Sequence, residues 1–303
     1  MTPLPQAARS AVDGWHPALV FLFFAAALLG CMVLANPVCL MVSFSAAGLL
    51  YGSLRGRGAW RFIVGLVAVV AVVACATPLF TTDGATVLFR WLGGRPYTAE
   101  ALALGASTGL ALAAMMLWFA SYHLVMTSEK FTFLFGRVAP ALSLLLTMTL
   151  RLVPAYRRKA DALLSARACI GKGARESDSL RERVVAGATV LGHLSADALE
   201  GAVITADSLR SRGFGLAGRT HFGIFRWTVR DAVILGLLAA VAAVSVVLMG
   251  PWGFGLAYFP TVVFPAPGAS AVAGLVCYGL FLTAPAVANG ERRLAWRWSL
   301  SRM

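Results

Sequence analysis

The feature that most constrains the fold of this 303-residue chain is a series of long apolar runs separated by short polar loops. A helix needs about 20 mostly apolar residues to cross the hydrocarbon core of a bilayer. The runs near this length are 17–35, 38–53, 62–78, 101–126, 232–250 and 269–288. Charged residues make up 13% of the chain, against about 25% in soluble domains. We therefore predict an all-α, polytopic membrane protein with about six transmembrane helices.

The loops between these runs predict the organisation and the orientation of the chain. The dipeptide Asn36-Pro37 favours a turn, so the first two runs should form a tight helical hairpin. Lys and Arg collect in cytoplasmic loops, and the basic segments all fall on one side of a six-span arrangement. Both termini and the basic middle segment are therefore expected in the cytoplasm, and only Arg90 and Arg95, in an outward-facing segment, oppose this.

Three parts follow from this pattern. Residues 1–126 should hold four membrane spans, residues 127–230 a cytoplasmic or interfacial helical region, and residues 231–303 two further spans and a basic tail. The formal net charge is +13, which would suit a nucleic-acid partner, but here the basic residues are interleaved with membrane spans. We therefore expect contact with the lipid bilayer and no contact with nucleic acid.

The middle part begins with an apolar stretch at 131–153, interrupted by arginines, and we expect bends at Pro140 inside it and at Pro154 directly after it. A helix along the inner membrane interface fits such a stretch. From 155 to 169 the chain turns basic and alanine-rich, and Gly171 and Gly173 should end this helix, as glycine often does. Arg167 would then lie near a helix C-terminus, where the helix dipole favours a cation.

A second amphipathic helix is predicted from about 183 to 212, after a charged loop at 176–183. Its apolar residues recur near helical spacing: Val184, Leu191, Leu194, Ala198, Ala202 and Leu209. Gly213 and Gly215 should end it, which leaves Arg210 and Arg212 at its tip in the arrangement expected for Arg167.

One face of this second helix is acidic. His193, Asp197, Glu200 and Asp207 follow one another at spacings of four, three and seven residues. With so many arginines nearby we expect these carboxylates to form interhelical ion pairs or a solvated face rather than a metal site. The candidate partners on the first helix are Arg151, Arg157 and Arg158.

These residues resemble those of a known family. Ala166-Arg167-Ala168 and Ser211-Arg212-Gly213, the latter directly after Arg210, match the X-Arg-X motifs of the T component of energy-coupling factor transporters, the CbiQ/EcfT group. Ala168 stands where the family often has glycine. The resemblance extends over most of the chain, through these further segments: Asn36-Pro37, Pro78-Leu79-Phe80, the stretch from Met126-Thr127-Ser128 to Pro154, and Gly218-Arg219-Thr220.

The resemblance implies a mechanism. In that family two long cytoplasmic coupling helices dock their arginines into grooves of two ABC ATPase subunits, and their apolar faces hold a small substrate-binding membrane subunit. ATP hydrolysis then drives uptake of a vitamin or a metal ion, such as cobalt or nickel, across the inner cell membrane. The chain itself is expected to bind no ATP, cofactor or metal and to catalyse no reaction.

Two alternatives belong to other classes: a stand-alone membrane permease and a membrane-embedded enzyme. A permease should show internal repeats or polar residues at mid-membrane depth, and no expected span carries a buried carboxylate or lysine. An enzyme would need clustered catalytic groups, for which His193, Asp197 and Glu200 are the candidates. The pattern G-x-G-x-x-G at 213–218 follows a helix rather than a strand, which argues against a dinucleotide site.

Overall fold

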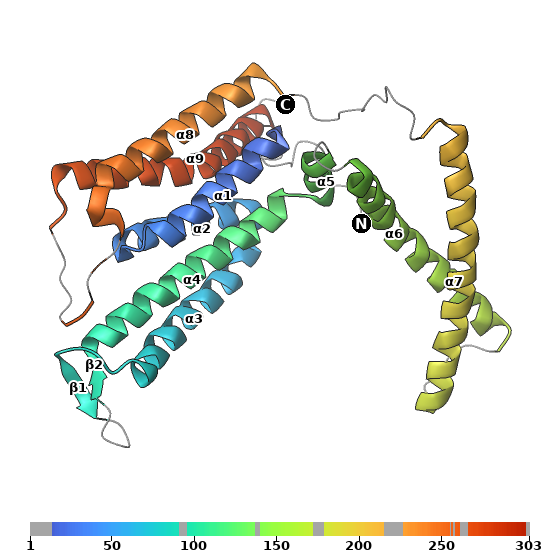
Figure 1. Ribbon diagram of the computed structural model, residues 1–303, viewed down its shortest axis with the longest axis horizontal. Helices are drawn as coiled ribbons and strands as arrows, with labels where there is room; N and C mark the ends of the chain where they lie inside the picture. The colour runs from blue at the N-terminus through green and yellow to red at the C-terminus, as the bar shows by residue number, and fades with distance from the viewer. Residues whose placement is uncertain are drawn as a thin grey trace. The chain divides into compact units, whose positions relative to one another are not determined.

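The computed structural model describes residues 14–90, 96–136, 140–171, 179–214, 227–254, 256, 258–260 and 266–300. The chain divides into two compact units (Figure 1). The first comprises Met1–Lys130 and Phe225–Met303, and the second comprises Phe131–Ile224.

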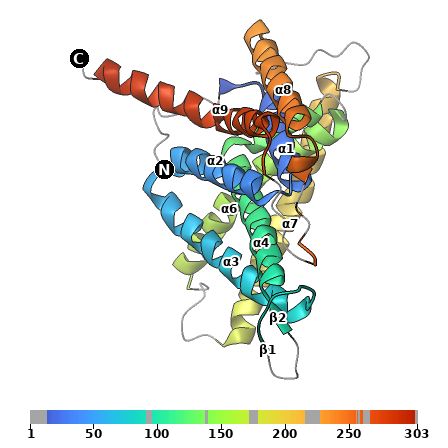
Figure 2. The same ribbon diagram turned by 90° about the vertical axis from the view of Figure 1, so that its left-hand side faces the viewer.

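The first unit is a bundle of six helices, which lie alongside one another in Figures 1 and 2. They are α1 (Pro17–Val33), α2 (Pro37–Arg55), α3 (Ala59–Phe80), α4 (Ala99–Val125), α8 (Val229–Met249) and α9 (Ala269–Leu300). A short 3-10 helix, η3 (Gly56–Gly58), joins α2 to α3. A second one, η4 (Gly250–Phe254), follows α8. Helix α4 packs against α2 and α3, and α9 packs against α2 and α8.

Five of the described helices are long and apolar enough to cross a membrane, namely α2, α3, α4, α8 and α9. Helix α1 is apolar but has 17 residues. The helical, polytopic membrane fold expected from the apolar runs is therefore confirmed. The apolar run at 38–53, which is short for a span, becomes long enough because α2 extends from Pro37 to Arg55.

The helical hairpin expected at Asn36-Pro37 is present, and Asn36 holds it in place. Its side-chain oxygen accepts a hydrogen bond from the Val38 backbone N–H at 3.1 Å, which caps α2. Its side-chain NH₂ donates to the Trp252 carbonyl at 2.8 Å. Because Asn36 is buried, both bonds are needed to offset the loss of its contact with water.

Two carboxylates are buried in the first turns of α4 and α8, directly before the runs 101–126 and 232–250, in which none was expected. Asp231 forms a capping box with Thr228, since each side chain accepts a hydrogen bond from the other residue's backbone N–H. Glu100 accepts hydrogen bonds from the backbone and side chain of Thr86. Both lie at helix N-termini, where backbone N–H groups need partners, and not at mid-membrane depth.

A small antiparallel sheet, which the sequence pattern did not suggest, precedes α4. It consists of β1 (Val87–Arg90) and β2 (Pro96–Thr98), and it lies at the end of the bundle where α3 ends and α4 begins (Figures 1 and 2). Val87 pairs with Thr98, and Phe89 pairs with Tyr97. The fold is thus helical with one short hairpin.

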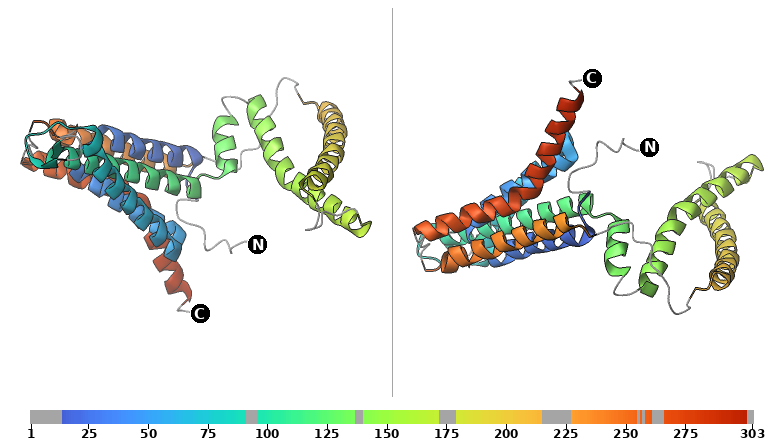
Figure 3. Two further views of the ribbon diagram at one scale, coloured as in Figure 1. Left: turned by 90° about the horizontal axis from the view of Figure 1, so that it is seen from below. Right: turned by 90° about the horizontal axis from the view of Figure 1, so that it is seen from above.

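The second unit consists mainly of two long helices, α6 (Pro140–Cys169) and α7 (Leu180–Ser211), shown in Figure 3. A short helix, α5 (Ser128–Gly136), leads into it. Pro140 begins α6, and Pro154, where a bend was expected, lies inside the helix. Proline removes one hydrogen bond of the helix, and the remaining bonds continue α6 for 15 residues beyond it.

Helix α7 begins earlier than expected. Ser179 accepts a hydrogen bond from the Glu182 backbone N–H, and the Glu182 carboxylate accepts one from the Ser179 N–H. This capping box starts the helix at Leu180. Residues 180–183, which were expected to belong to a loop, therefore form the first turn of α7.

Candidate functional site

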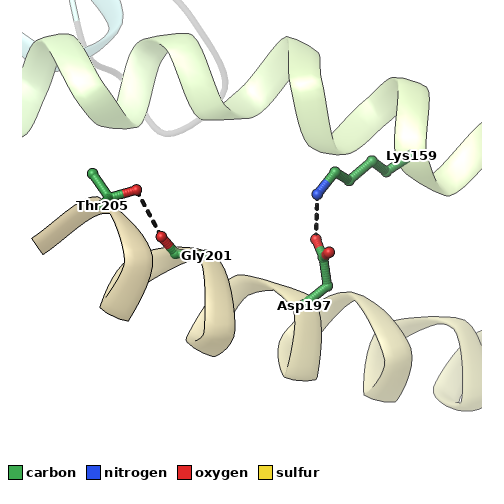
Figure 4. A network of polar contacts seen from close by, with 4 residues as sticks. All are labelled: Lys159, Asp197, Gly201 and Thr205. Carbon is green, nitrogen blue, oxygen red and sulfur yellow. Dashed lines mark hydrogen bonds and ion pairs between the residues drawn. The ribbon is translucent and has the colours of Figure 1, made fainter. Parts of the chain in front are cut away.

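The arginines that the sequence analysis singled out lie on the two-helix unit, and the contact between α6 and α7 determines where their ends point. The helices meet where Lys159 of α6 and Asp197 of α7 form an ion pair at 2.5 Å (Figure 4). In Figures 1 and 3 the C-terminal ends of α6 and α7 lie on opposite sides of this crossing. The two ends therefore point away from each other.

Asp197 of α7 forms an interhelical ion pair with Lys159, which is not one of the arginines expected as partners. The ammonium group of Lys159 donates a hydrogen bond to Asp197, which raises the pKa of Lys159 above its ordinary value of 10.5. Each side chain is about half exposed, at 52% and 48%, so solvent weakens the attraction and the pair contributes little to stability.

The remaining acidic residues of α7 were not found in the expected pairs. Within the part of the chain that the structure describes, no ion pair joins Arg151 or Arg158 to Glu200 or Asp207. All four side chains are exposed. Among the same residues, no group of three His, Cys, Asp or Glu side chains could hold a metal ion. The acidic face is therefore solvated apart from Asp197.

Helix α7 packs on α6 through a stripe of small and aliphatic residues. The less exposed positions of α7 are 186, 190, 194, 198, 201 and 209, and Val190 is its one buried residue among the described residues. Thr205 donates to the Gly201 carbonyl at 2.6 Å, so the hydroxyl is satisfied within α7 (Figure 4). Leu194 and Ala198 were expected on the apolar face, whereas Val190 was missed.

Much of the apolar surface of both helices is left uncovered by the described residues. Exposed aliphatic side chains include Leu142, Leu145, Leu152 and Val153 on α6 and Val184, Leu199, Val203 and Ile204 on α7. So many exposed apolar side chains normally mark contact with another protein or with lipid.

Both helices end at a glycine in the left-handed region, as expected. Gly171 has φ +75° and Gly213 has φ +73°. In α6 the Gly171 N–H bonds to the Ala168 carbonyl at 3.1 Å, and in α7 the Gly213 N–H bonds to the Arg210 carbonyl at 3.0 Å. The Phe214 N–H also bonds to the Leu209 carbonyl at 3.0 Å, which completes a Schellman motif.

The arginines do not occupy equivalent positions relative to these glycines. Arg167 lies four residues before Gly171, while Arg210 and Arg212 lie three residues and one residue before Gly213. The two tips therefore share a terminating glycine, as expected, but they differ in the position of the arginine relative to that glycine. Arg210 and Arg212 are exposed and Arg167 is half-buried, so the second tip presents its charges more openly.

The flanking motif residues add little bulk at the tips. Ala166, Ala168 and Ser211 are exposed, and the Ser211 hydroxyl donates to the Ser208 carbonyl at 2.9 Å. Some expected features lie outside the described residues: Arg137, Gly173, Gly215 and the Gly218-Arg219-Thr220 segment.

A comparison of the sequence with protein-family models finds no matching family, and a comparison with curated proteins finds no match.

Proposed function

We propose that this chain is the membrane scaffold subunit of an energy-coupling factor type ABC importer, with α6 and α7 as its coupling helices. In this role two cytoplasmic ATPase subunits bind the helix ends, and a small substrate-binding membrane subunit binds the apolar helix faces. The chain transmits movement from the ATPases to that subunit and catalyses no reaction itself. The imported substrate is a vitamin or a metal ion.

The observation that carries this proposal is the pair of long helices, attached to a membrane bundle, whose ends each carry arginine within four residues of a terminating glycine. A guanidinium group can make two parallel hydrogen bonds with a carboxylate, which fixes direction as well as distance. Such a bond at a helix end transmits force because the helix backbone is stiff along its axis.

The directions of the two ends support two separate ATPase contacts. Arg167 lies eight residues beyond Lys159, and Arg212 lies fifteen residues beyond Asp197. At 1.5 Å per residue these arms extend about 12 Å and about 22 Å from the crossing. Since the ends point away from each other, a single groove would not receive both.

The uncovered apolar surface of α6 and α7 supports the second partner. Their exposed aliphatic side chains lie on both helices on either side of the crossing. A membrane subunit can cover them while the charged ends remain in the cytoplasm.

The test is the double variant Arg167→Ala/Arg212→Ala, purified from native membranes through an affinity tag. Removing one partner from a buried, hydrogen-bonded pair costs roughly 3–5 kcal/mol, so affinity for each ATPase should fall by more than about 100-fold. We expect the variant to lose its nucleotide-binding partners and their ATP hydrolysis while keeping the small membrane subunit, as judged by mass spectrometry.

The matched control is Arg157→Ala/Arg158→Ala, which removes the same charge from exposed positions in the middle of α6. This control should retain both ATPases. The proposal fails if the tip variant keeps both ATPases with normal ATP turnover, or if the unaltered chain brings down no nucleotide-binding protein.

A further inference from the structure

The hairpin of β1 and β2 exposes apolar side chains at one end of the membrane bundle. Val87, Leu88 and Phe89 are 45%, 57% and 48% exposed. The Phe89 ring stacks on the Tyr97 ring with centroids 4.6 Å apart and planes 15° apart, which holds Phe89 in place without burying it. Three consecutive apolar residues in a strand are unfavourable in water.

This exposure occurs on a hairpin whose base is firmly held. Thr86 donates from its backbone and its side chain to the buried Glu100, and the Thr98 hydroxyl donates to the Asp83 carbonyl at 2.8 Å. The Ala85 N–H bonds to the Pro260 carbonyl at 3.1 Å. These bonds fix the strands against the bundle, so the apolar side chains cannot turn inward without breaking them.

A contact with α3 places the hairpin at the level of the membrane surface. The Tyr97 hydroxyl donates to the Cys75 carbonyl at 3.3 Å. Cys75 lies five residues before the end of α3, a helix long and apolar enough to cross a membrane. At 1.5 Å per residue the contact lies about 7.5 Å inside that end. Leu79 and Phe80, in the last turn of α3, are also exposed.

The backbone excludes a deeper position. The sheet has two strands among the described residues, so one edge of β1 has no strand partner. Open sheet edges do not occur in the lipid hydrocarbon, because their N–H and C=O groups have no water there. Arg90 is exposed at the end of β1, and a long basic side chain at this depth reaches lipid phosphates. Together these features match the headgroup region.

We propose that the β1–β2 hairpin is a lipid anchor that lies in the headgroup region of the bilayer leaflet at this end of the bundle. Val87, Leu88 and Phe89 contact the upper acyl chains, and Arg90 contacts lipid phosphates. This inference does not depend on the proposed transport function. The proposed anchor also accounts for Arg90, a basic residue in a segment that is expected to face away from the cytoplasm.

The test uses a nitroxide spin label at Leu88→Cys in the full chain reconstituted into phosphatidylcholine and phosphatidylglycerol vesicles. The exposed and half-buried cysteines Cys75, Cys169 and Cys277 are first replaced by alanine. Collision with oxygen, which concentrates in acyl chains, is compared with collision with a water-soluble nickel chelate. A label at Asp83→Cys, exposed at the base of the hairpin, is the matched control.

At Leu88 we expect the ratio of oxygen to nickel accessibility to exceed that at Asp83 several-fold. A second label at Val87 should give the same result, which guards against a local distortion by the first. Equal ratios at Leu88 and Asp83 would place the hairpin in water and overturn the proposal. Labels shielded from both reagents would show a protein partner in place of lipid and would overturn it as well.

Discussion

At the scale of single residues, the two glycines that end α6 and α7 determine where the arginines stand. A left-handed residue stops the helix and turns the chain away, so the last helical turn becomes a free end. Gly171 and Gly213 both adopt this conformation. The arginines before them project from helix ends because of these two backbone positions, and not because their own side chains are held.

We expect Gly171→Ala to loosen the end of α6. An L-residue in the left-handed region costs about 1–2 kcal/mol, and nothing within 4 Å of the added Cβ would resist it sterically, so the effect is conformational. Hydrogen–deuterium exchange of the peptide covering 160–171 should be faster. The control Gly187→Ala, in an open position of α7, should slow exchange or leave it unchanged because alanine favours helix. If both variants exchanged at equal rates, the result would contradict the role of Gly171 in holding the end of α6.

At the scale of elements, the described residues hold α6 and α7 together by one ion pair and one stripe of small and aliphatic residues. Val190 is the buried apolar residue of this contact in the described part of α7. Two helices with so small an interface can change their angle at little cost in buried area. The proposed coupling role requires such a contact, because the proposed partners would then control the angle between α6 and α7.

We expect Lys159→Met to broaden the distribution of distances between spin labels at Ala162 and Ala196, measured by pulsed electron paramagnetic resonance. The hydrogen bond with Asp197 raises the pKa of Lys159 above 10.5. The stabilising contribution of Lys159 is therefore fully present below pH 10.5 and is lost as the pH rises through the raised pKa.

The double variant Lys159→Asp/Asp197→Lys should restore the narrow distribution, and Arg158→Met, which neighbours the pair, should have no effect. High salt should weaken the pair because both groups are about half exposed. A Lys159→Met variant indistinguishable from the unaltered chain at pH 7 would show that the small-residue stripe alone holds the crossing.

At the scale of the whole molecule, the membrane unit contains close backbone contacts between helices. A Cβ added at Gly105 of α4 would lie 2.7 Å from the Thr77 Cβ and 3.0 Å from the Ala74 Cα of α3. Small residues allow helices to approach closely, which is how helices associate where lipid removes the hydrophobic drive. Gly105 therefore lets α3 and α4 pack closely within the membrane unit.

We expect Gly105→Val to destabilise the membrane unit by about 1–3 kcal/mol, because α3 and α4 must move apart to admit the side chain. Thermal unfolding in detergent should show a lower midpoint. Gly236→Val on α8 is the matched control, since nothing lies within 4 Å of its Cβ. Similar midpoints for the two variants would show that the α3–α4 contact is not tight in solution.

The sequence by itself determined the membrane class, most helix positions and the glycines that end α6 and α7, because hydropathy and glycine conformation act locally. The capping box at Ser179 was also readable as a Ser-x-x-Glu pattern, although it was missed. Only the tertiary structure decided that Lys159 and not Arg158 pairs with Asp197, and that α6 continues through Pro154. It also revealed the hairpin before α4, which is held by Glu100 and Thr86. Neighbouring residues on a helix point about 100° apart, so the partner of a side chain depends on how two helices meet, and no local pattern records that.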